Sequence, residues 1–83
     1  MNVRLHAHAP EPVLERGAAE AEVVASVAGG ETFPAKYGRF GFRRNFRFQG
    51  QRRGKSYTIK QIEAYAVREG EDWLVVSVVV EFF

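Results

Sequence analysis

Three arginines at four-residue intervals are the clearest chemical signal in the chain. Arg39, Arg43 and Arg47 lie in a segment where arginine and phenylalanine alternate. Residues four apart on a β-strand share a face, so a strand here would repeat the guanidinium groups about every 13 Å. Such groups form paired hydrogen bonds with phosphates, and a row of them suits a nucleic-acid strand. The predicted nucleic-acid-binding residues are this row and three basic residues of the following loop, Arg52, Arg53 and Lys55.

The charge of the chain is concentrated in one segment. Residues 32–61 hold nine basic side chains, no acidic one and seven of the eleven aromatic residues. The rest of the chain has three basic residues against ten acidic ones, so a formal net charge of +2 conceals two opposite regions. A one-sided charge attracts anions. The alternative is an edge strand protected from aggregation by charge, but that needs only one or two charges.

The aromatic residues of this segment have two possible roles. Phe40, Phe42, Phe46 and Phe48 alternate with the basic residues. Exposed rings stack on single-stranded bases, but four rings on one strand face are also what a strand needs to pack against helices. Packing is the favoured interpretation for the phenylalanines. Two tyrosines, Tyr37 and Tyr57, are better stacking candidates because their hydroxyls tolerate water.

No catalytic motif is present, and the candidate catalytic residues are Lys36, Lys60 and Tyr65. A lysine can stabilise a phosphoryl transition state or act as a base, although a lysine on a solvated sheet face is common. Glu63 and Tyr65 share a strand parity that Lys60 does not, which weakens a triad. The chain has no Ser-His-Asp set, and its glycines do not form a nucleotide-binding loop.

No metal or cofactor is expected. The two histidines, His6 and His8, could point the same way on a strand, but a third ligand is not indicated. A histidine could also serve as an acid or base, or hydrogen-bond at the entry to the first helix. Without cysteine there is no disulfide and no thiolate zinc site.

The elements that would position these residues follow from periodicity and breakers. Alternation over residues 2–8 suggests a short strand, residues 13–16 a helical turn after two prolines, and residues 18–28 a helix that Gly29 and Gly30 end by entering the left-handed region. Further strands are predicted at residues 31–35, 39–48, 56–67 and 73–82, with a loop at 49–54. Alternation in the last strand puts Val78 on one face and Trp73 and Val75 on the other. Both faces are apolar, which predicts a central strand covered on both sides.

These elements predict one α+β domain over residues 1–83, with two N-terminal helices packed on a twisted antiparallel sheet of about four strands. The most apolar run, residues 73–80, is about half the length of a membrane-spanning helix. Without a signal peptide, a cytoplasmic protein with no membrane contact is expected. Because both faces of the last strand are apolar, the sequence is also compatible with a homodimer.

Several short stretches resemble a family of small bacterial domains of unknown function. They are His8-Ala9, Glu15-Arg16-Gly17, Gly30-Glu31, Ala35-Lys36, Gly38-Arg39, Lys60-Gln61 and Glu63-Ala64-Tyr65-Ala66-Val67. That family looks related to the RelE/ParE-type toxins, whose fold is two helices against a twisted antiparallel sheet. The resemblance implies RNA or the ribosome as a partner, since RelE-type members cut messenger RNA without a metal, whereas ParE-type members bind gyrase. No catalytic residue is carried across, and the chain ends at Phe83 without the C-terminal extension that often supplies functional residues in such toxins.

Three functions remain open at this point. The first is a RelE-like, toxin-type protein that binds RNA or cleaves it with its basic ribbon. The second is a non-catalytic module that binds an acidic protein such as an antitoxin. In the third, the basic stripe only keeps the domain soluble.

Overall fold

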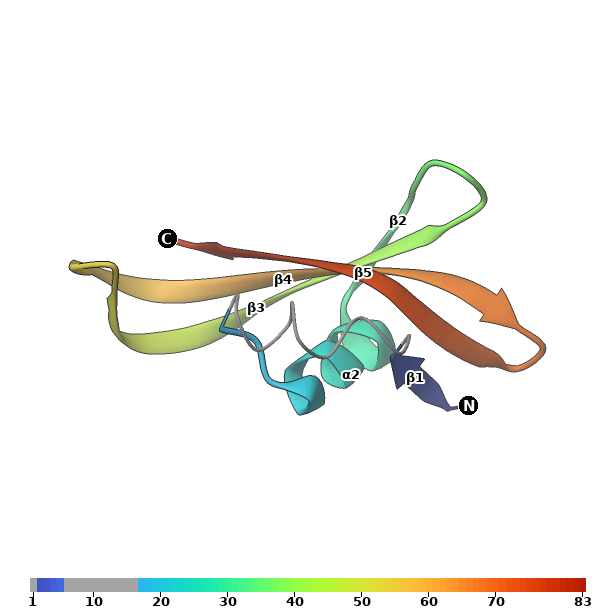
Figure 1. The fold of residues 1–83 in the computed structure, drawn as a ribbon, viewed down its shortest axis with the longest axis horizontal. Helices are drawn as coiled ribbons and strands as arrows, with labels where there is room; N and C mark the ends of the chain where they lie inside the picture. The colour runs from blue at the N-terminus through green and yellow to red at the C-terminus, as the bar shows by residue number, and fades with distance from the viewer. Residues whose placement is uncertain (1, 6–16) are drawn as a thin grey trace.

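The computed structural model describes residues 2–5 and 17–83. They form a five-stranded sheet with a single described helix (Figure 1). The elements are β1 (Val3–Leu5), α2 (Glu20–Gly29), β2 (Glu31–Pro34), β3 (Phe40–Arg52), β4 (Lys55–Glu69) and β5 (Asp72–Phe82). The strand order is β1-β5-β4-β3-β2, and β1 runs parallel to β5 while the other pairs are antiparallel.

The predicted fold of two helices on a four-stranded antiparallel sheet is wrong. The described chain is mostly strand, with one helix of ten residues and a mixed sheet of five strands. The difference has a physical reason: β3 and β4 are 13 and 15 residues long, and β1 adds a parallel strand at the edge. The predicted helical turn at residues 13–16 and the end of the strand predicted over residues 2–8 lie outside the described residues.

The helix α2 covers one face of the sheet. It begins after Ala19, whose backbone N–H donates to the Glu22 carboxylate at 2.9 Å, and it buries Val23, Ser26 and Val27 against the sheet. Its ten residues are half the roughly twenty that a membrane-spanning helix needs, so the described part of the chain holds no helix long and apolar enough to cross a membrane.

The hairpin between β3 and β4 is tighter than the predicted loop at residues 49–54. Only Arg53 and Gly54 separate the strands, and both have positive φ, 53° and 79°. Two successive left-handed residues match the twist of a hairpin, and glycine takes the second position without strain. The pairing shifts between Arg47 and Gly50, so β3 carries one extra residue there.

A second register shift, opposite Tyr65 and Ala66, changes which residues of β5 face the helix. Simple alternation places Trp73 and Val75 on the face opposite Val78, and that prediction is wrong: all three lie in the same core. The buried hydrophobic residues of the core are Ala18, Val23, Val27, Phe42, Ile62, Ala64, Ala66, Trp73, Val75 and Val78. The rings of Phe40 and Phe42 both contact Trp73, edge to face, at 5.2 and 5.1 Å.

Candidate nucleic-acid interface

The face of the sheet turned away from α2 carries the predicted arginine row and Tyr65. Phe42, Ala64 and Val78 are buried beneath the helix, so their strand neighbours point the opposite way. Cross-strand pairing then places Arg43 beside Glu63, Gly41 beside Tyr65, and Tyr65 beside Ser77 on that side. We call the side that holds Phe33, Arg43, Glu63, Tyr65 and Ser77 the open face.

The predicted arginine row lies on the open face, but its centre is neutralised. Arg43 and Arg47 follow the open-face parity of β3, and Arg39 precedes the strand in the same parity. Arg43 donates its Nε–H to Glu63 Oε2 at 2.7 Å and stacks on Phe33, with its guanidinium carbon 4.6 Å from the ring centre. The hydrogen bond to Glu63 raises the pKa of Arg43, against a smaller opposing effect of desolvation. Arg43 is therefore engaged within the molecule, and the row is not a continuous basic stripe.

Lys60 lies on the helix side, away from the other two candidate catalytic residues. It is only 8% exposed, and its ammonium donates to the Gly17 carbonyl at 3.0 Å and to Glu22 Oε1 at 2.6 Å. An ammonium held by two intramolecular acceptors fixes the approach to α2. The structure does not bring it together with Lys36 or Tyr65.

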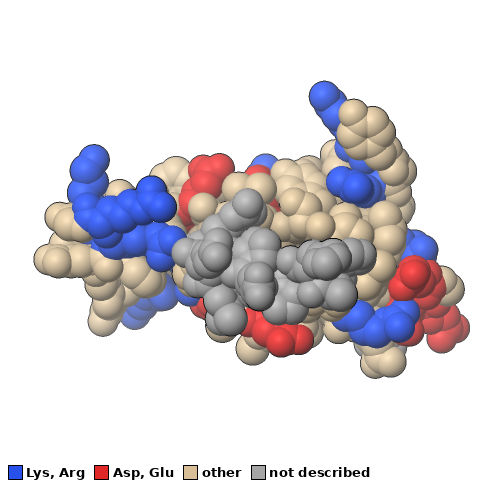
Figure 2. Space-filling view, viewed as in Figure 1, with Lys and Arg blue, Asp and Glu red and all other residues tan. Residues whose placement is uncertain are grey.

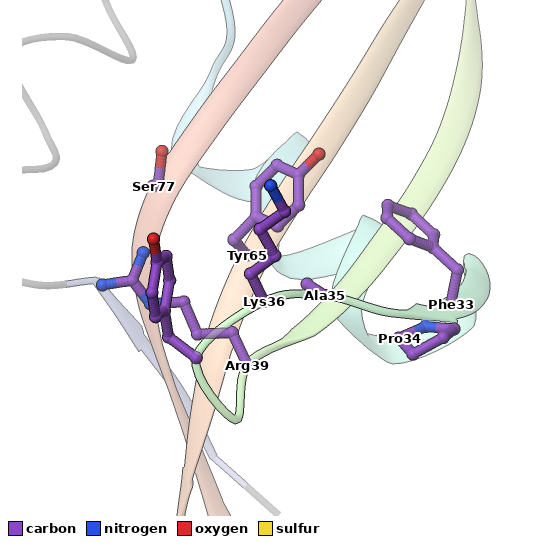
Figure 3. A pocket seen from close by; sticks show the side chains of 8 residues that line it. Phe33, Pro34, Ala35, Lys36, Arg39, Tyr65 and Ser77 are labelled. Atoms are coloured by element: carbon purple, nitrogen blue, oxygen red, sulfur yellow. The ribbon is translucent and has the colours of Figure 1, made fainter.

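A cleft of about 570 Å³ opens on the open face beside the β2–β3 loop (Figure 3). We call it the loop cleft; its lining is Phe33, Pro34, Ala35, Lys36, Tyr37, Arg39, Tyr65 and Ser77. The loop is closed by hydrogen bonds from Ala35 N–H to the Arg39 carbonyl and from Arg39 N–H to the Lys36 carbonyl, at 3.1 and 3.3 Å. Of the residues predicted from the sequence, the cleft brings together Lys36, Tyr37, Arg39 and Tyr65, two of which are cations.

Tyr37 lies at the rim of the loop cleft, in the turn between β2 and β3. Its φ is +62° and that of Gly38 is +69°, so the two are the left-handed central residues of a hairpin turn like that at Arg53 and Gly54. The turn leaves 87% of Tyr37 exposed and presents its ring to solvent beside two cations. The ring is available for stacking on a base.

Tyr65 offers the loop cleft a protonated hydroxyl. Desolvation by burial, then the negative charge of Glu63, raises the pKa of Tyr65 above its ordinary value of 10.0. The hydroxyl lies 3.4 Å from Glu63 Oε1, and the ring meets Phe33 edge to face at 5.9 Å. A phenol that keeps its proton at neutral pH serves as a hydrogen-bond donor or a general acid, and not as a base.

The raised pKa of Tyr65 predicts a pH dependence of stability. Above about pH 10 the unfolded chain loses the Tyr65 proton while the folded chain retains it, so stability falls as pH rises through this range. In Tyr65→Phe that part of the alkaline loss should disappear, and the phenolate absorbance titration of the folded protein should lose the contribution of Tyr65. Equal alkaline losses in the two proteins would contradict the assignment.

A second cleft, of about 460 Å³, lies at the tip of the β3–β4 hairpin. We call it the tip cleft; its lining is Arg52, Arg53, Tyr57, Val79, Val80 and Phe82. The Arg52 guanidinium lies over the Phe82 ring at 4.9 Å, and the rings of Tyr57 and Phe82 are 5.7 Å apart. Cations and aromatic rings are combined here as they are in the loop cleft.

The basic side chains gather at the two ends of the sheet. Figure 2 shows Lys and Arg over the hairpin tip on the left and over the β2–β3 loop at the upper right, with a further basic group at the lower right. Seven exposed cations have no carboxylate within ion-pair distance among residues 2–5 and 17–83, but Arg44 and Arg68 donate to backbone carbonyls and lie over rings. The side chains of the other five make no hydrogen bond, ion pair or ring contact in that part of the chain; they are Lys36, Arg39, Arg47, Arg53 and Lys55. Unpaired cations on a surface remain available to an external anion.

The described residues hold no group of three potential metal ligands, and His6 and His8 lie outside them. Sequence reasoning missed Phe33, Pro34 and Ser77 as cleft residues. Only the pairing of β2 with β3 and of β4 with β5 brings them to the cleft, so no local signal marks them. Comparison with protein-family models, with curated proteins and with solved structures found no match for the chain. The chemistry of this surface is therefore the basis for inferring function.

Proposed function

We propose that the protein binds RNA through the exposed cations of the loop cleft, the tip cleft and the strand between them. The supporting observation is that Lys36, Arg39, Arg47, Arg53 and Lys55 are exposed, without a carboxylate partner among the described residues. Phosphate neutralisation by such residues supplies most of the affinity of a nucleic-acid-binding protein. The pairing of Arg43 with Glu63 removes the centre of the predicted row, but Arg39 and Arg47 of that row remain among these five cations.

The aromatic residues favour RNA over an acidic protein as the partner. An acidic peptide, such as the tail of an antitoxin, satisfies cations but offers no base to a stacking ring. The exposed ring of Tyr37 stands beside Lys36 and Arg39, and Tyr57 lines the same cleft as Arg53. A ring next to a cation is the arrangement that single-stranded RNA uses, with its bases stacked and its phosphates paired.

The salt dependence of RNA binding tests the proposal. For single strands the logarithm of the affinity falls by about 0.7 per phosphate contact for each tenfold rise in salt, so five contacts predict a loss of about 100-fold between about 50 and 200 mM salt. Fluorescence anisotropy with a labelled single-stranded RNA measures this slope. Arg53→Ala should reduce the slope by about 0.7. Arg4→Ala removes the same charge from a residue paired with Glu69 and should leave the slope unchanged.

A flat salt response, or no binding at low salt, would overturn the proposal. Binding of a polyglutamate peptide in preference to RNA would point to the acidic-protein alternative. The same RNA incubations, resolved on a denaturing gel, report cleavage, which Lys36 and Tyr65 would carry by charge stabilisation and proton donation. Intact RNA would leave binding as the whole function.

A further inference from the structure

The two clefts meet on β5. Ser77 lines the loop cleft and Val79 lines the tip cleft. Residues two apart on a strand point to the same side and lie about 7 Å apart. Ser77 and Val79 belong to the open face, since they pair with Tyr65 and Glu63. Two other residues of the tip cleft, Val80 and Phe82, pair with Ile62 and Lys60 and lie on the helix side, so the tip cleft extends round the edge of β5. The clefts therefore begin at opposite ends of the sheet and end at neighbouring positions on one strand.

Each cleft has the same chemistry, and the surface between them differs. The loop cleft joins Lys36 and Arg39 to the ring of Tyr37, and the tip cleft joins Arg53 to the ring of Tyr57. Between them the open face carries the ion pair of Arg43 with Glu63, whose charges cancel. Anchoring groups lie at the ends. Between them Arg47 of β3 adds one cation without a described carboxylate partner, and the open-face residues of β5 (Ser77, Val79 and Glu81) add none.

We propose that the two clefts are the halves of one track for a single-stranded polynucleotide, which crosses β5 over Ser77 and Val79 and is held at its two ends. This inference rests on the proposed function. The strand must be unpaired because rings at both ends act on exposed base faces, which a duplex keeps stacked inside. Two linked anchoring sites raise the affinity of a ligand that spans both, without any new contact.

An acidic residue stands beside this track. Glu81 is the next residue of the open face along β5 after Val79, opposite Gln61, and it is exposed. Its negative charge reaches the centre of the open face, because it contributes to raising the pKa of Tyr65. A phosphate that passes over Val79 is repelled by Glu81, and one that follows β3 instead is two strands away from it.

The size of the molecule sets the length of RNA required. Its longest dimension is 42 Å. At about 3.4 Å per stacked nucleotide, a strand that joins the two ends has about a dozen nucleotides, and fewer where it is extended. Shorter strands reach one cleft at a time.

Oligouridines from about four to about twenty nucleotides, titrated at one low salt concentration, test the two-ended track. Affinity should rise by at least about 100-fold at the length that bridges the clefts and change little beyond it. The paired variants Lys36→Ala with Arg39→Ala, and Arg53→Ala with Lys55→Ala, should each abolish this step and reduce a long oligouridine to the affinity of a short one. A duplex of the same length should bind like a short single strand.

Charge removal at Glu81 is a test with the opposite sign, so damage to the protein cannot mimic it. Glu81→Gln should tighten binding of a long oligouridine about threefold. Glu71→Gln makes the same change in charge at the β4–β5 turn, outside both clefts, and should have no effect. Wild-type affinity in Glu81→Gln would show that the strand does not cross β5.

A smooth increase of affinity with length would overturn the two-ended track. So would equal losses in the paired variants for short and long oligouridines, or equal binding of duplex and single strand. These results all require RNA binding, so they differ from the failure of the proposed function, in which no RNA of any length binds with salt sensitivity.

Discussion

Gly30→Ala is expected to lower the free energy of unfolding by about 3 kcal/mol, because a methyl group at this position has no space. A Cβ on Gly30 would meet the carbonyl oxygen of Ser26 and would lie 2.7 Å from the carbonyl oxygen of Arg43. Both are backbone atoms, one in α2 and one in β3, so neither can turn aside as a side chain would. The substitution must separate the end of the helix from the sheet. It would also disturb the hydrogen bond that Gly30 N–H donates to the Ser26 carbonyl at 2.8 Å.

Gly29→Ala is the matched control for this prediction. A Cβ on Gly29 meets only the end of the Arg44 side chain, at 3.5 Å, and Gly29 is the last residue of α2. Alanine in a helix is favoured over glycine, so this variant should be unchanged or more stable by about 0.5 kcal/mol. Urea unfolding of the two variants measures both effects. Equal stabilities would show that the close approach of α2 to β3 is not what requires glycine at residue 30.

This glycine also shows where sequence reasoning gave the right boundary for the wrong reason. The Gly-Gly pair ends the helix as predicted, but Gly30 has a φ of −82°, which any residue can adopt, so left-handed geometry is not its role. The contact that excludes a side chain comes from Arg43, which is distant in sequence. A requirement of this kind leaves no local pattern in the chain.

The long strands were predictable because apolar and polar residues alternate along them, and β3, β4 and β5 overlap the predicted ranges. The register in which β3 pairs with β4 was not predictable. A regular hairpin turning at Arg53 and Gly54 would pair Arg43 with Ala64, but the extra residue after Arg47 places it opposite Glu63. One bulge therefore decides whether this arginine faces a neutral residue or a carboxylate. The parallel pairing of β1 joins Val3 to Trp73 and had no signal either.

The candidate site was predictable in its residue types and not in its grouping. The excess of positive charge indicated a surface for anions, and six of the nine basic residues of the segment are exposed without a described carboxylate partner. One of the six, Arg44, donates to the Ala25 carbonyl of the helix. Their separation into two groups depends on Glu63 and Lys60, whose partners are fixed only by the folded sheet. The alternation of charge along β3 could not reveal that the central arginine is paired across the strands.

Glu22→Gln is expected to lower the free energy of unfolding by about 3 kcal/mol, because it leaves the buried ammonium of Lys60 without a counter-charge. The Lys60 side chain is 11% exposed, and Glu22 Oε1 accepts from both Lys60 and the backbone N–H of Ala19, at 2.6 and 2.9 Å. Glutamine preserves the size of the side chain and an acceptor oxygen, so the loss measures the charge. Urea unfolding measures this loss, first in Glu22→Gln alone and then in Glu22→Gln combined with a substitution of Lys60.

Lys60→Met removes the ammonium and should cost less than Glu22→Gln, since no isolated charge remains in the core. The double variant should be more stable than Glu22→Gln alone by at least about 1 kcal/mol, the sign of a coupled pair. Additive losses would contradict a direct interaction between the two side chains. Because Lys60 faces α2 and not the open face, folded Lys60→Met should bind RNA with wild-type affinity. A weakened RNA affinity in Lys60→Met would instead show that Lys60 takes part in RNA binding. The variant therefore distinguishes a residue that positions the helix from the residues that hold the ligand.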